Sequence, residues 1–384
     1  MGLTVAVTGP TGELGTSVVA ALEREPRVDA VLGMARRPFD PGSRGWVKTA
    51  YRRGDVLDRA AVDALVAEAD VVVHLAYVVF GSHSESARVN LEGCRTVFEA
   101  TAAATGPRRL VFTSSVAAYG YHADTPVPIV ETTPVRGSTE HYYSAQKAAC
   151  EQVLTEVTAG TGLDVYVLRP CIVAGPQATQ IVRLLPWRLA AARLDGPLAA
   201  GRSAVGRLAR AVPASGRFGP LGALRVLRSL EVLGARGALG ARGALGALRP
   251  LLPDPGVTLQ LVHHDDVADA VVAAVLGAGP PGAYNLAGRG TITFGDYVRG
   301  VGAVPVPVPH GVLGLASGLL AATSATPAWA EWLHTLRVPM VVDATKAHEL
   351  LGWTPRHTAA QTLAATVAAA TPGRSGVAVR RAPR

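Results

Sequence analysis

The sequence is poor in cysteine, with three residues in 384, and these show neither a paired nor a metal-ligand spacing. This excludes a disulfide-stapled secreted scaffold and is typical of a reduced, cytoplasmic protein without a bound metal. Aromatic residues make up only 5% of the chain, so stacking surfaces for nucleic-acid bases are scarce. Nucleic-acid binding is therefore a weak alternative despite an isoelectric point near 9.7. Met1 runs directly into a predicted strand, so we expect no secretory leader.

Long apolar runs are also scarce, apart from residues 300–330, which carry no charged side chain. The run has the length of a membrane span. Four prolines interrupt it, however, and proline breaks the interior of a helix. We expect a loop and helix of a substrate-binding domain here, with membrane association as the disfavoured alternative.

The net basic charge of the chain comes from one segment of unusual composition, residues 177–256. Between Arg183 and Arg249 there are twelve arginines against Asp195 and Glu231, a balance of +10, whereas the whole chain carries +8. The segment repeats a six-residue unit, residues 233–238 and 239–244, and its glycines weaken a helix by about 1 kcal/mol each relative to alanine.

Three interpretations of this insert stay open. It is a weakly ordered surface expansion, a lid over the substrate pocket, or a basic segment that contacts an anionic membrane surface. For a lid, the candidate contact residues are those nearest its start: Arg183, Leu184, Leu185, Trp187 and Arg188.

A glycine turn lies between the first predicted strand, residues 3–8, and an apolar-periodic helix. Its glycines, Gly9, Gly12 and Gly15, are spaced G-x-x-G-x-x-G. Such a turn lets a dinucleotide pyrophosphate approach the helix N-terminus, where free N–H groups and the helix dipole favour an anion. The alternative is a tight turn that binds nothing.

A tyrosine and a lysine, Tyr143 and Lys147, stand four residues apart. On a helix they lie on one face, where they can act as one acid/base unit. Tyr142 has no such partner, because Gln146 follows it at the same spacing. Alone the spacing is common on amphipathic helices, so its meaning depends on the rest of the chain.

Together these motifs resemble the extended short-chain dehydrogenase/reductase family, which includes nucleotide-sugar epimerases and hydroxysteroid dehydrogenases. The resemblance covers residues 1–176 and 257–356 and fails between them. It rests on the glycine turn, the Tyr143–Lys147 pair and the following segments: Gly54 to Val56, Val71 to Ala76, Asn90, Leu110 to Gly120, Leu168 to Pro170, Val262 to Ala268 and Leu350 to Pro355.

The resemblance implies an α/β fold with a doubly wound parallel Rossmann sheet and a smaller C-terminal substrate domain. We expect the Rossmann domain at residues 1–176, completed by 257–276 with a strand near 259–262. The insert would follow at 177–256, and the substrate domain with a C-terminal tail at 277–384. Asp266 would hold the start of a helix, and His263 and His264 beside it would be structural rather than metal ligands.

The resemblance also implies a catalytic set of Ser115, Tyr143 and Lys147. Tyr143 would donate or accept the proton while a hydride moves. Ser115 would hydrogen-bond the substrate oxygen that receives or gives up this proton, with Ser114 as a supporting hydroxyl. Lys147 would depress the pKa of Tyr143 and hold the nicotinamide ribose.

The cofactor is expected to be a nicotinamide dinucleotide. An acidic residue at the end of the second strand would bind the ribose 2′-OH, but Ala35 stands there, followed by Arg36 and Arg37. Guanidinium groups suit a 2′-phosphate, so NADP(H) is preferred over NAD(H), unless both arginines only face solvent. The expected cofactor-binding residues are Thr8, Gly9, Thr11, Gly12, Glu13, Leu14, Gly15, Arg36, Arg37, Asp55, Val56, Leu75, Ala76, Asn90, Lys147, Pro170 and Ile172.

We expect a small-molecule substrate of lower polarity than a nucleotide sugar. Where nucleotide-sugar members of the family carry an asparagine for the diphosphate, this chain has Ile172, and Ala174 replaces a frequent tyrosine. The function expected is oxidoreduction at an alcohol or carbonyl carbon. A nucleotide-sugar epimerase or dehydratase with recycled cofactor is the alternative, and a cofactor-sensing or interaction protein a weaker one. A homodimer is a further expectation. The expected substrate contacts are Tyr77, Val116, Tyr119, Cys171 and Val173.

Overall fold

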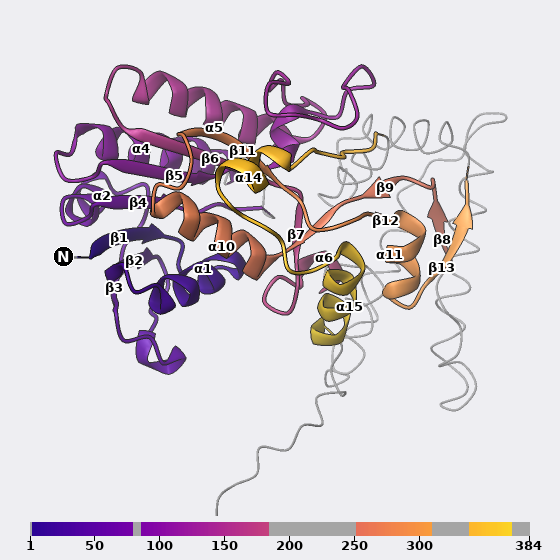
Figure 1. Ribbon diagram of the computed structural model, residues 1–384, viewed down its shortest axis with the longest axis horizontal. Coiled ribbons are helices and arrows are strands. Elements are labelled where there is room, and N and C mark those ends of the chain that lie inside the picture. Colours follow the sequence, from indigo (N-terminus) through magenta and orange to yellow (C-terminus); the bar gives the residue numbers. More distant parts are fainter. Residues whose placement is uncertain (1, 80–85, 184–250, 309–337, 371–384) are drawn as a thin grey trace, which may run out of the picture.

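The computed structural model describes residues 2–79, 86–183, 251–308 and 338–370 (Figure 1). Most of the arginine-rich insert and most of the uncharged run at 300–330 lie outside these residues. The expected lid contacts from Leu184 to Arg188, and the loop and helix expected within 309–330, therefore lie outside the described residues. In the part that is described, no helix is both long and apolar enough to cross a membrane.

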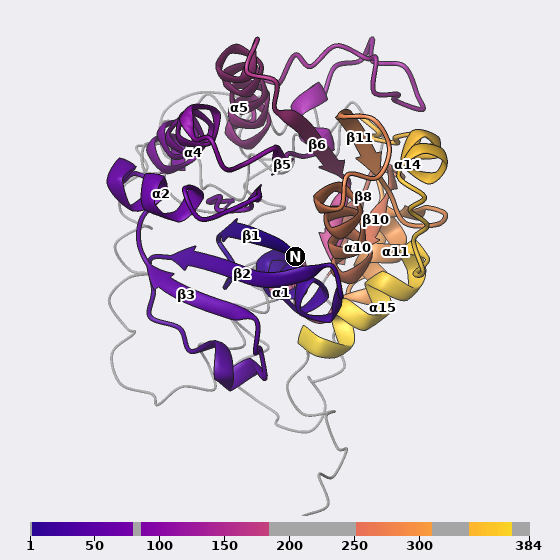
Figure 2. The same cartoon turned by 60° about the vertical axis from the view of Figure 1, so that its left-hand side comes forward.

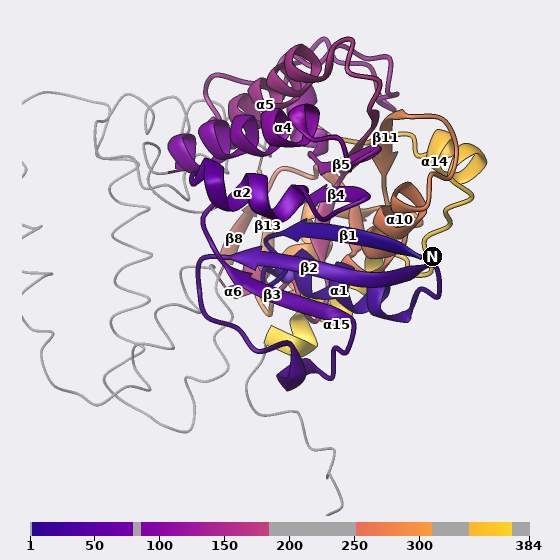
Figure 3. The ribbon, with the colours of Figure 1, turned by 90° about the vertical axis from the view of Figure 1, so that its left-hand side faces the viewer.

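A seven-stranded parallel sheet forms the centre of the protein (Figures 1 and 3). Its strand order is β11-β6-β5-β4-β1-β2-β3, so the order reverses between β1 and β4, where ligands bind in doubly wound sheets. The strands are β1 (Leu3–Thr8), β2 (Val28–Ala35), β3 (Thr49–Arg53), β4 (Val71–His74), β5 (Arg109–Thr113), β6 (Asp164–Pro170) and β11 (Gly282–Leu286).

Helices cover both faces of this sheet (Figure 2). On one face α1 (Glu13–Arg24) packs beside α10 (His264–Val275). On the other face lie α2 (Arg59–Val66), α4 (Gly93–Ala103) and α5 (Tyr142–Thr158). The inner strands β1, β4 and β5 are largely buried because each face of the sheet carries its own apolar core. Short helical turns η1 (Pro41–Arg44), η2 (Arg88–Glu92) and η3 (Val116–Tyr119) connect these elements.

A smaller part lies beside the sheet and contains three two-stranded sheets (Figure 1). Two apolar clusters of its own hold it together. Its strands are β7 (Ile172–Ala174) with β10 (Leu261–His263), β9 (Thr258–Leu259) with β12 (Ile292–Thr293), and β8 (Leu251–Asp254) with β13 (Val304–Pro307). Its helices are α6 (Gln180–Arg183), α11 (Phe294–Gly300) and α15 (Ala359–Ala370). In contrast, α14 (Thr345–Leu350) packs against β11 and belongs to the core of the large sheet.

The fold class is as expected, but the strand that completes the sheet is not. The strand predicted near 259–262 lies outside the sheet, because β10 pairs with β7. The seventh strand is β11, which pairs with β6 and lies in the range predicted for the substrate domain. The insert was also drawn too long, since β8 pairs with β13. The segments of β10 and β11 are both short and apolar, and only their long-range pairing shows which of them belongs to the sheet.

The expectation for the start of α10 is also wrong. The N-cap is His263, whose side chain accepts a hydrogen bond from the Asp265 amide. Asp266 lies inside the helix, fully buried, and accepts instead from the backbone and ring of His357. Asp266 therefore joins α10 to the segment that follows α14.

Candidate active site

The glycine turn after β1 is shaped by the backbone packed around it. Gly9 has a φ of +76°, and a Cβ there would lie 2.8 Å from the Ala76 amide nitrogen, beyond the end of β4. At Gly15 a Cβ would lie 2.0 Å from the Gly9 carbonyl oxygen. Glycine is required at both positions because no side chain fits between these backbones.

Gly12 is different, because the protein leaves room for a side chain there. It is exposed, and the nearest atom to a Cβ would be the Gly9 carbonyl oxygen at 3.5 Å. Gly12 is the N-cap of α1 and provides no side-chain cap, so the first N–H groups of the helix are available to an anion. The turn therefore fits a dinucleotide pyrophosphate, and a side chain at Gly12 would fill its cradle.

The side chains of two residues near this turn that were predicted to bind the cofactor are hydrogen-bonded to other parts of the protein. Thr8 Oγ1 forms a 2.7 Å hydrogen bond with His74 Nδ1 and accepts a longer one from the Ala76 amide. Glu13 Oε1 accepts a hydrogen bond from the amide of Thr179. These side chains tie β1 and α1 to neighbouring segments. Thr11 is half-buried and Leu14 packs against the core under the helix.

The predicted catalytic residues come together at the carboxyl edge of the sheet. Ser115 follows β5 and caps η3, its Oγ accepting from the Ala117 amide. Tyr143, in the first turn of α5, is hydrogen-bonded to the Ser115 side chain. Lys147 lies one turn further along α5, and its Nζ donates to the carbonyl oxygen of Thr113 at the end of β5. The three residues thus form one cluster, although they come from two separate segments.

The pKa of Tyr143 departs from the expectation. Burial raises it to about 12, and the hydrogen bond with Ser115 acts in the opposite direction. Tyr143 is therefore a neutral phenol at neutral pH and is suited to donate a proton. Burial lowers the pKa of Lys147. The expected lowering of the tyrosine pKa by Lys147 does not outweigh this burial, and the Lys147 ammonium lies against another ring.

That ring belongs to Tyr77, in the segment that leaves β4. Lys147 Nζ lies 3.6 Å from the centre of the Tyr77 ring but 6.0 Å from that of Tyr143. Tyr77 and Tyr143 meet edge to face, with ring centres 5.7 Å apart. Tyr77, an expected substrate contact, therefore packs against both catalytic residues of α5.

Asn90 and two residues of α5 hold the segment that contains Tyr77. The Asn90 side chain accepts from the Val78 amide and donates to the Val78 carbonyl and to Gln146 Oε1, at 2.8–2.9 Å. The Tyr142 hydroxyl donates to the Val79 carbonyl. Asn90, predicted to bind cofactor, is thus fully buried with its side chain occupied. Gln146 and Tyr142 were missed because neither carries a charge.

Arginines surround the end of β2, where the adenosine ribose is expected. Arg36 and Arg37 are exposed, and Arg53, at the end of β3 beside Ala35, is exposed as well. Arg53 Nε donates to the Arg36 carbonyl and Tyr51 donates to the Arg37 carbonyl, so both backbones are held. Arg53 was missed because strand pairing, not sequence distance, brings it here.

The third-strand motif lies at the same edge. Asp55 is half-buried and accepts from the Leu57 amide, and Val56 is buried. Leu75 and Ala76 are half-buried directly after β4. These four predicted residues therefore line the carboxyl ends of β3 and β4.

The expected substrate contacts divide into accessible and buried residues. Ile172 is 38% exposed at the start of β7, and Val173 beside it is half-buried. Cys171 and Val116 are buried in the apolar core, and Pro170 is buried at the end of β6. Of the predicted apolar residues on the β6–β7 exit, Ile172 therefore presents the most surface.

Tyr119, an expected substrate contact, lies in the core of the described structure. It is fully buried, and its hydroxyl donates to Asn285 Oδ1 while accepting from Arg169 Nη1, both at 2.8 Å. Arg169 in turn binds Glu151 with two hydrogen bonds of 3.0 and 2.6 Å. Ser114 donates to the same carboxylate.

This buried network lies directly behind the catalytic cluster. Glu151 stands one turn after Lys147 on α5, and Ser114 precedes Ser115. The side chains of Arg169 and Glu151 are 8% and 9% exposed. The network therefore fixes α5 against the ends of β5 and β6. The spacing of Glu151 from Lys147 was the available sequence signal, but its partner on β6 was not predictable.

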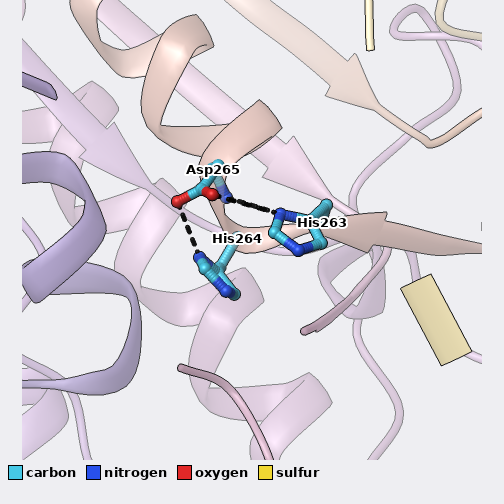
Figure 4. A group of neighbouring side chains, drawn as sticks. All are labelled: His263, His264 and Asp265. Atoms are coloured by element: carbon cyan, nitrogen blue, oxygen red, sulfur yellow. Dashed lines mark hydrogen bonds and ion pairs between the residues drawn. The ribbon is translucent and has the colours of Figure 1, made fainter. Parts of the chain in front are cut away.

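A second polar cluster joins α10 to the α1 side of the sheet (Figure 4). His263, His264 and Asp265 bring three potential metal-ligand atoms within 4.8 Å of one another. His264 Nε2 accepts from the Gln177 amide, and its Nδ1 bonds to Ser17 Oγ and contacts Asp265. Both ring nitrogens of His264 are thus engaged in hydrogen bonds that connect α10 to neighbouring segments.

We expect the protein to lose stability in mild acid. Burial, followed by His264 and His357, lowers the pKa of His263 to about 4, and burial with Lys147 lowers that of His74 to about 3. Both ordinary values are 6.5, so the unfolded chain takes up these protons first as pH falls. Between pH 7 and pH 5 each histidine costs about 2 kcal/mol of unfolding free energy.

Urea unfolding at a series of pH values measures this loss. The variant His263→Asn keeps a side-chain acceptor for the α10 N-cap and should show a smaller decline between pH 6.5 and pH 4. A decline as steep as that of the unchanged protein would contradict the role of His263.

Comparison with known proteins agrees with this architecture. The family model described as the NAD dependent epimerase/dehydratase family matches residues 5–202. Human 3 beta-hydroxysteroid dehydrogenase type 7 is 34% identical over 207 residues, 47% of this chain and 53% of that protein. Cinnamoyl-CoA reductase 1 of rice (Oryza sativa subsp. japonica) is 32% identical over 189 residues, 46% of this chain and 55% of that protein. The chain thus spans about half the length of these curated relatives.

Solved structures of similar fold match nearly the whole chain. A short-chain dehydrogenase/reductase superfamily protein from Agrobacterium tumefaciens with bound NAD covers 95% of this chain and 96% of its own, with a TM-score of 0.62 at 18% identity. With the family model matching just over half of the sequence, through the glycine turn and the Tyr143–Lys147 helix, the chain belongs to the NAD dependent epimerase/dehydratase family of extended short-chain dehydrogenase/reductases.

Proposed function

We propose that the protein is an NADP(H)-preferring oxidoreductase that interconverts an alcohol and a carbonyl group on a small substrate without strong negative charge. The observation that carries the proposal is the cluster of Ser115, Tyr143 and Lys147 at the carboxyl edge of the sheet. The open Gly12 turn, at the point where strand order reverses, supports it.

In this proposal the nicotinamide cofactor supplies or accepts the hydride. Tyr143 donates its phenolic proton to the carbonyl oxygen of the substrate during reduction and takes it back during oxidation. The Ser115 hydroxyl binds the same oxygen and positions it next to the phenol. The raised pKa of Tyr143 keeps the proton donor loaded at neutral pH.

Dinucleotide binding would use the backbone of the glycine turn. Residues of the first turn of α1 would hold the pyrophosphate, and Asp55, Val56, Leu75 and Ala76 would line the adenosine side. Lys147 would hold the nicotinamide ribose. Arg36 and Arg37, together with Arg53, would bind a 2′-phosphate.

The substrate class follows from the exit of β6. The exposed Ile172 offers an apolar surface where a diphosphate would need hydrogen-bond donors. A ketone, aldehyde or alcohol with a largely apolar body fits this surface better than a nucleotide sugar. Of the relatives named above, the hydroxysteroid dehydrogenase supports this choice.

An epimerase or dehydratase is the second candidate, because the family model includes both activities. It would use the same three catalytic residues with a cofactor that is regenerated within each turnover. The purified protein separates the two functions. Oxidation of added NADPH by a panel of apolar ketones and aldehydes supports the oxidoreductase, whereas tightly retained cofactor and turnover of UDP-sugars without added NADPH support the epimerase.

The preference for NADPH is expected to depend on the two arginines after β2. The double variant Arg36→Ser with Arg37→Ser should bind NADPH about 10- to 100-fold more weakly, because charge-assisted hydrogen bonds to the phosphate are lost. Its affinity for NADH should change little. Calorimetric titration measures both, with Arg44→Ser as the control for loss of an exposed arginine. Tighter binding of NADH than NADPH by the unchanged protein would contradict the assignment.

A further inference from the structure

The Lys147 ammonium has an internal partner that the proposed chemistry does not use. Its Nζ lies 3.6 Å from the centre of the Tyr77 ring, and the lysine is only 3% exposed. An ammonium against the face of an aromatic ring is attracted by it, more strongly when water is excluded. Together with the Thr113 carbonyl, this ring stabilises the buried charge.

The Tyr77 hydroxyl, by contrast, gains nothing from this position. Its oxygen is buried and has no hydrogen-bond partner among the described residues. A buried hydroxyl without a partner is unfavourable relative to one that is bonded. The ring contact with Lys147 and the edge-to-face contact with Tyr143 therefore hold Tyr77 in place, while its hydroxyl opposes them.

The backbone on the carboxyl side of Tyr77 is anchored independently of its side chain. Asn90 holds Val78 through both its amide and its carbonyl, and Tyr142 holds the Val79 carbonyl. Rotation of the Tyr77 side chain away from Lys147 therefore requires no loss of these bonds. The contact can open at the level of one side chain.

We propose that Tyr77 determines the affinity for the nicotinamide half of the cofactor by competing, through its ring, with the bound ribose for the Lys147 ammonium. This inference rests on the proposed function, in which Lys147 holds that ribose. A ligand that must displace an internal partner binds more weakly by the free energy of the contact it replaces. The adenosine half, at the ends of β2 and β3, does not meet this competitor.

Calorimetric titration of the full-length protein with NADPH and with 2′,5′-ADP, which lacks the nicotinamide half, tests the proposal. Tyr77→Leu and Tyr77→Met remove the ring and should bind NADPH roughly tenfold more tightly. Tyr77→Phe keeps the ring and should stay within about twofold of the unchanged protein. The affinity for 2′,5′-ADP should be the same in all four. If NADH is the tighter dinucleotide, NADH and AMP replace this pair.

Several results would overturn the proposal. Equal or weaker NADPH binding by Tyr77→Leu and Tyr77→Met would show that the ring is a fixed wall or a cofactor contact. An effect of Tyr77→Phe equal to that of Tyr77→Leu would assign the effect to the hydroxyl. A parallel change in 2′,5′-ADP affinity would assign it to the fold. Thermal unfolding identifies any variant that fails to fold, and the other aliphatic variant then decides.

The proposed function fails in a different way. If the unchanged protein binds neither NADPH nor NADH, the oxidoreductase assignment falls whatever the variants do. If it binds one of them and the aliphatic variants bind no more tightly, only the role of Tyr77 falls.

Discussion

Replacing Tyr143 by phenylalanine is expected to lower kcat at least about 100-fold, because positioned general acid–base groups contribute 10²- to 10⁴-fold. The phenylalanine keeps the ring that meets Tyr77 and loses only the hydroxyl bonded to Ser115. Cofactor affinity should change little. Steady-state rates with NADPH and an active carbonyl substrate, together with a direct titration of NADPH, measure the two effects separately.

The matched control is Tyr166→Phe, on β6. Its hydroxyl donates to the Gly279 carbonyl near the amino-terminal end of β6, opposite to the end at which the proposed site lies. This variant should keep its catalytic rate and lose only a little stability. A rate for Tyr143→Phe equal to that of the control would reject Tyr143 as the proton donor.

Replacing Glu151 by alanine is expected to cost about 3–5 kcal/mol of unfolding free energy, the usual loss when one member of a buried ion pair is removed. The substitution leaves the Arg169 guanidinium buried without its carboxylate and removes the acceptor of Ser114. Because these bonds fix α5 beside the ends of β5 and β6, the rate should fall as well. Chemical unfolding followed by circular dichroism measures the stability.

Two comparisons isolate the ion pair. Glu156→Ala removes an exposed carboxylate from the same helix and should change stability by less than about 1 kcal/mol. The double variant Glu151→Leu with Arg169→Met should lose less unfolding free energy than Glu151→Leu and Arg169→Met lose in sum when each is made alone, because no unpaired charge remains. Strict additivity of the two single losses would contradict a coupled buried pair.

Local features of the site were predictable because they depend on residues close together in sequence. The Tyr143–Lys147 pair needs only the pitch of one helix, and the glycine turn needs only a strand and a helix in succession. Both stand where they were expected. Ser115 came from the resemblance to the family rather than from helix pitch, and it caps η3 just beyond the end of β5.

Contacts between distant segments were not predictable in this way. Tyr77 and Lys147 are 70 residues apart, and Glu151 and Arg169 lie on different elements. The burial that raises the pKa of Tyr143 comes from such contacts. The expectation that Lys147 lowers this pKa did not include Tyr77, whose ring faces the ammonium.

By itself the sequence determined the place of the glycine turn and the catalytic helix, because these follow from periodicity and short-range spacing, and its resemblance to a known family supplied the fold class. Only the tertiary structure decided that β11 completes the sheet, that Tyr119 is a core residue and that Tyr77 faces Lys147. The physical reason is that strand pairing, burial and charge–ring contacts depend on which distant segments meet in space.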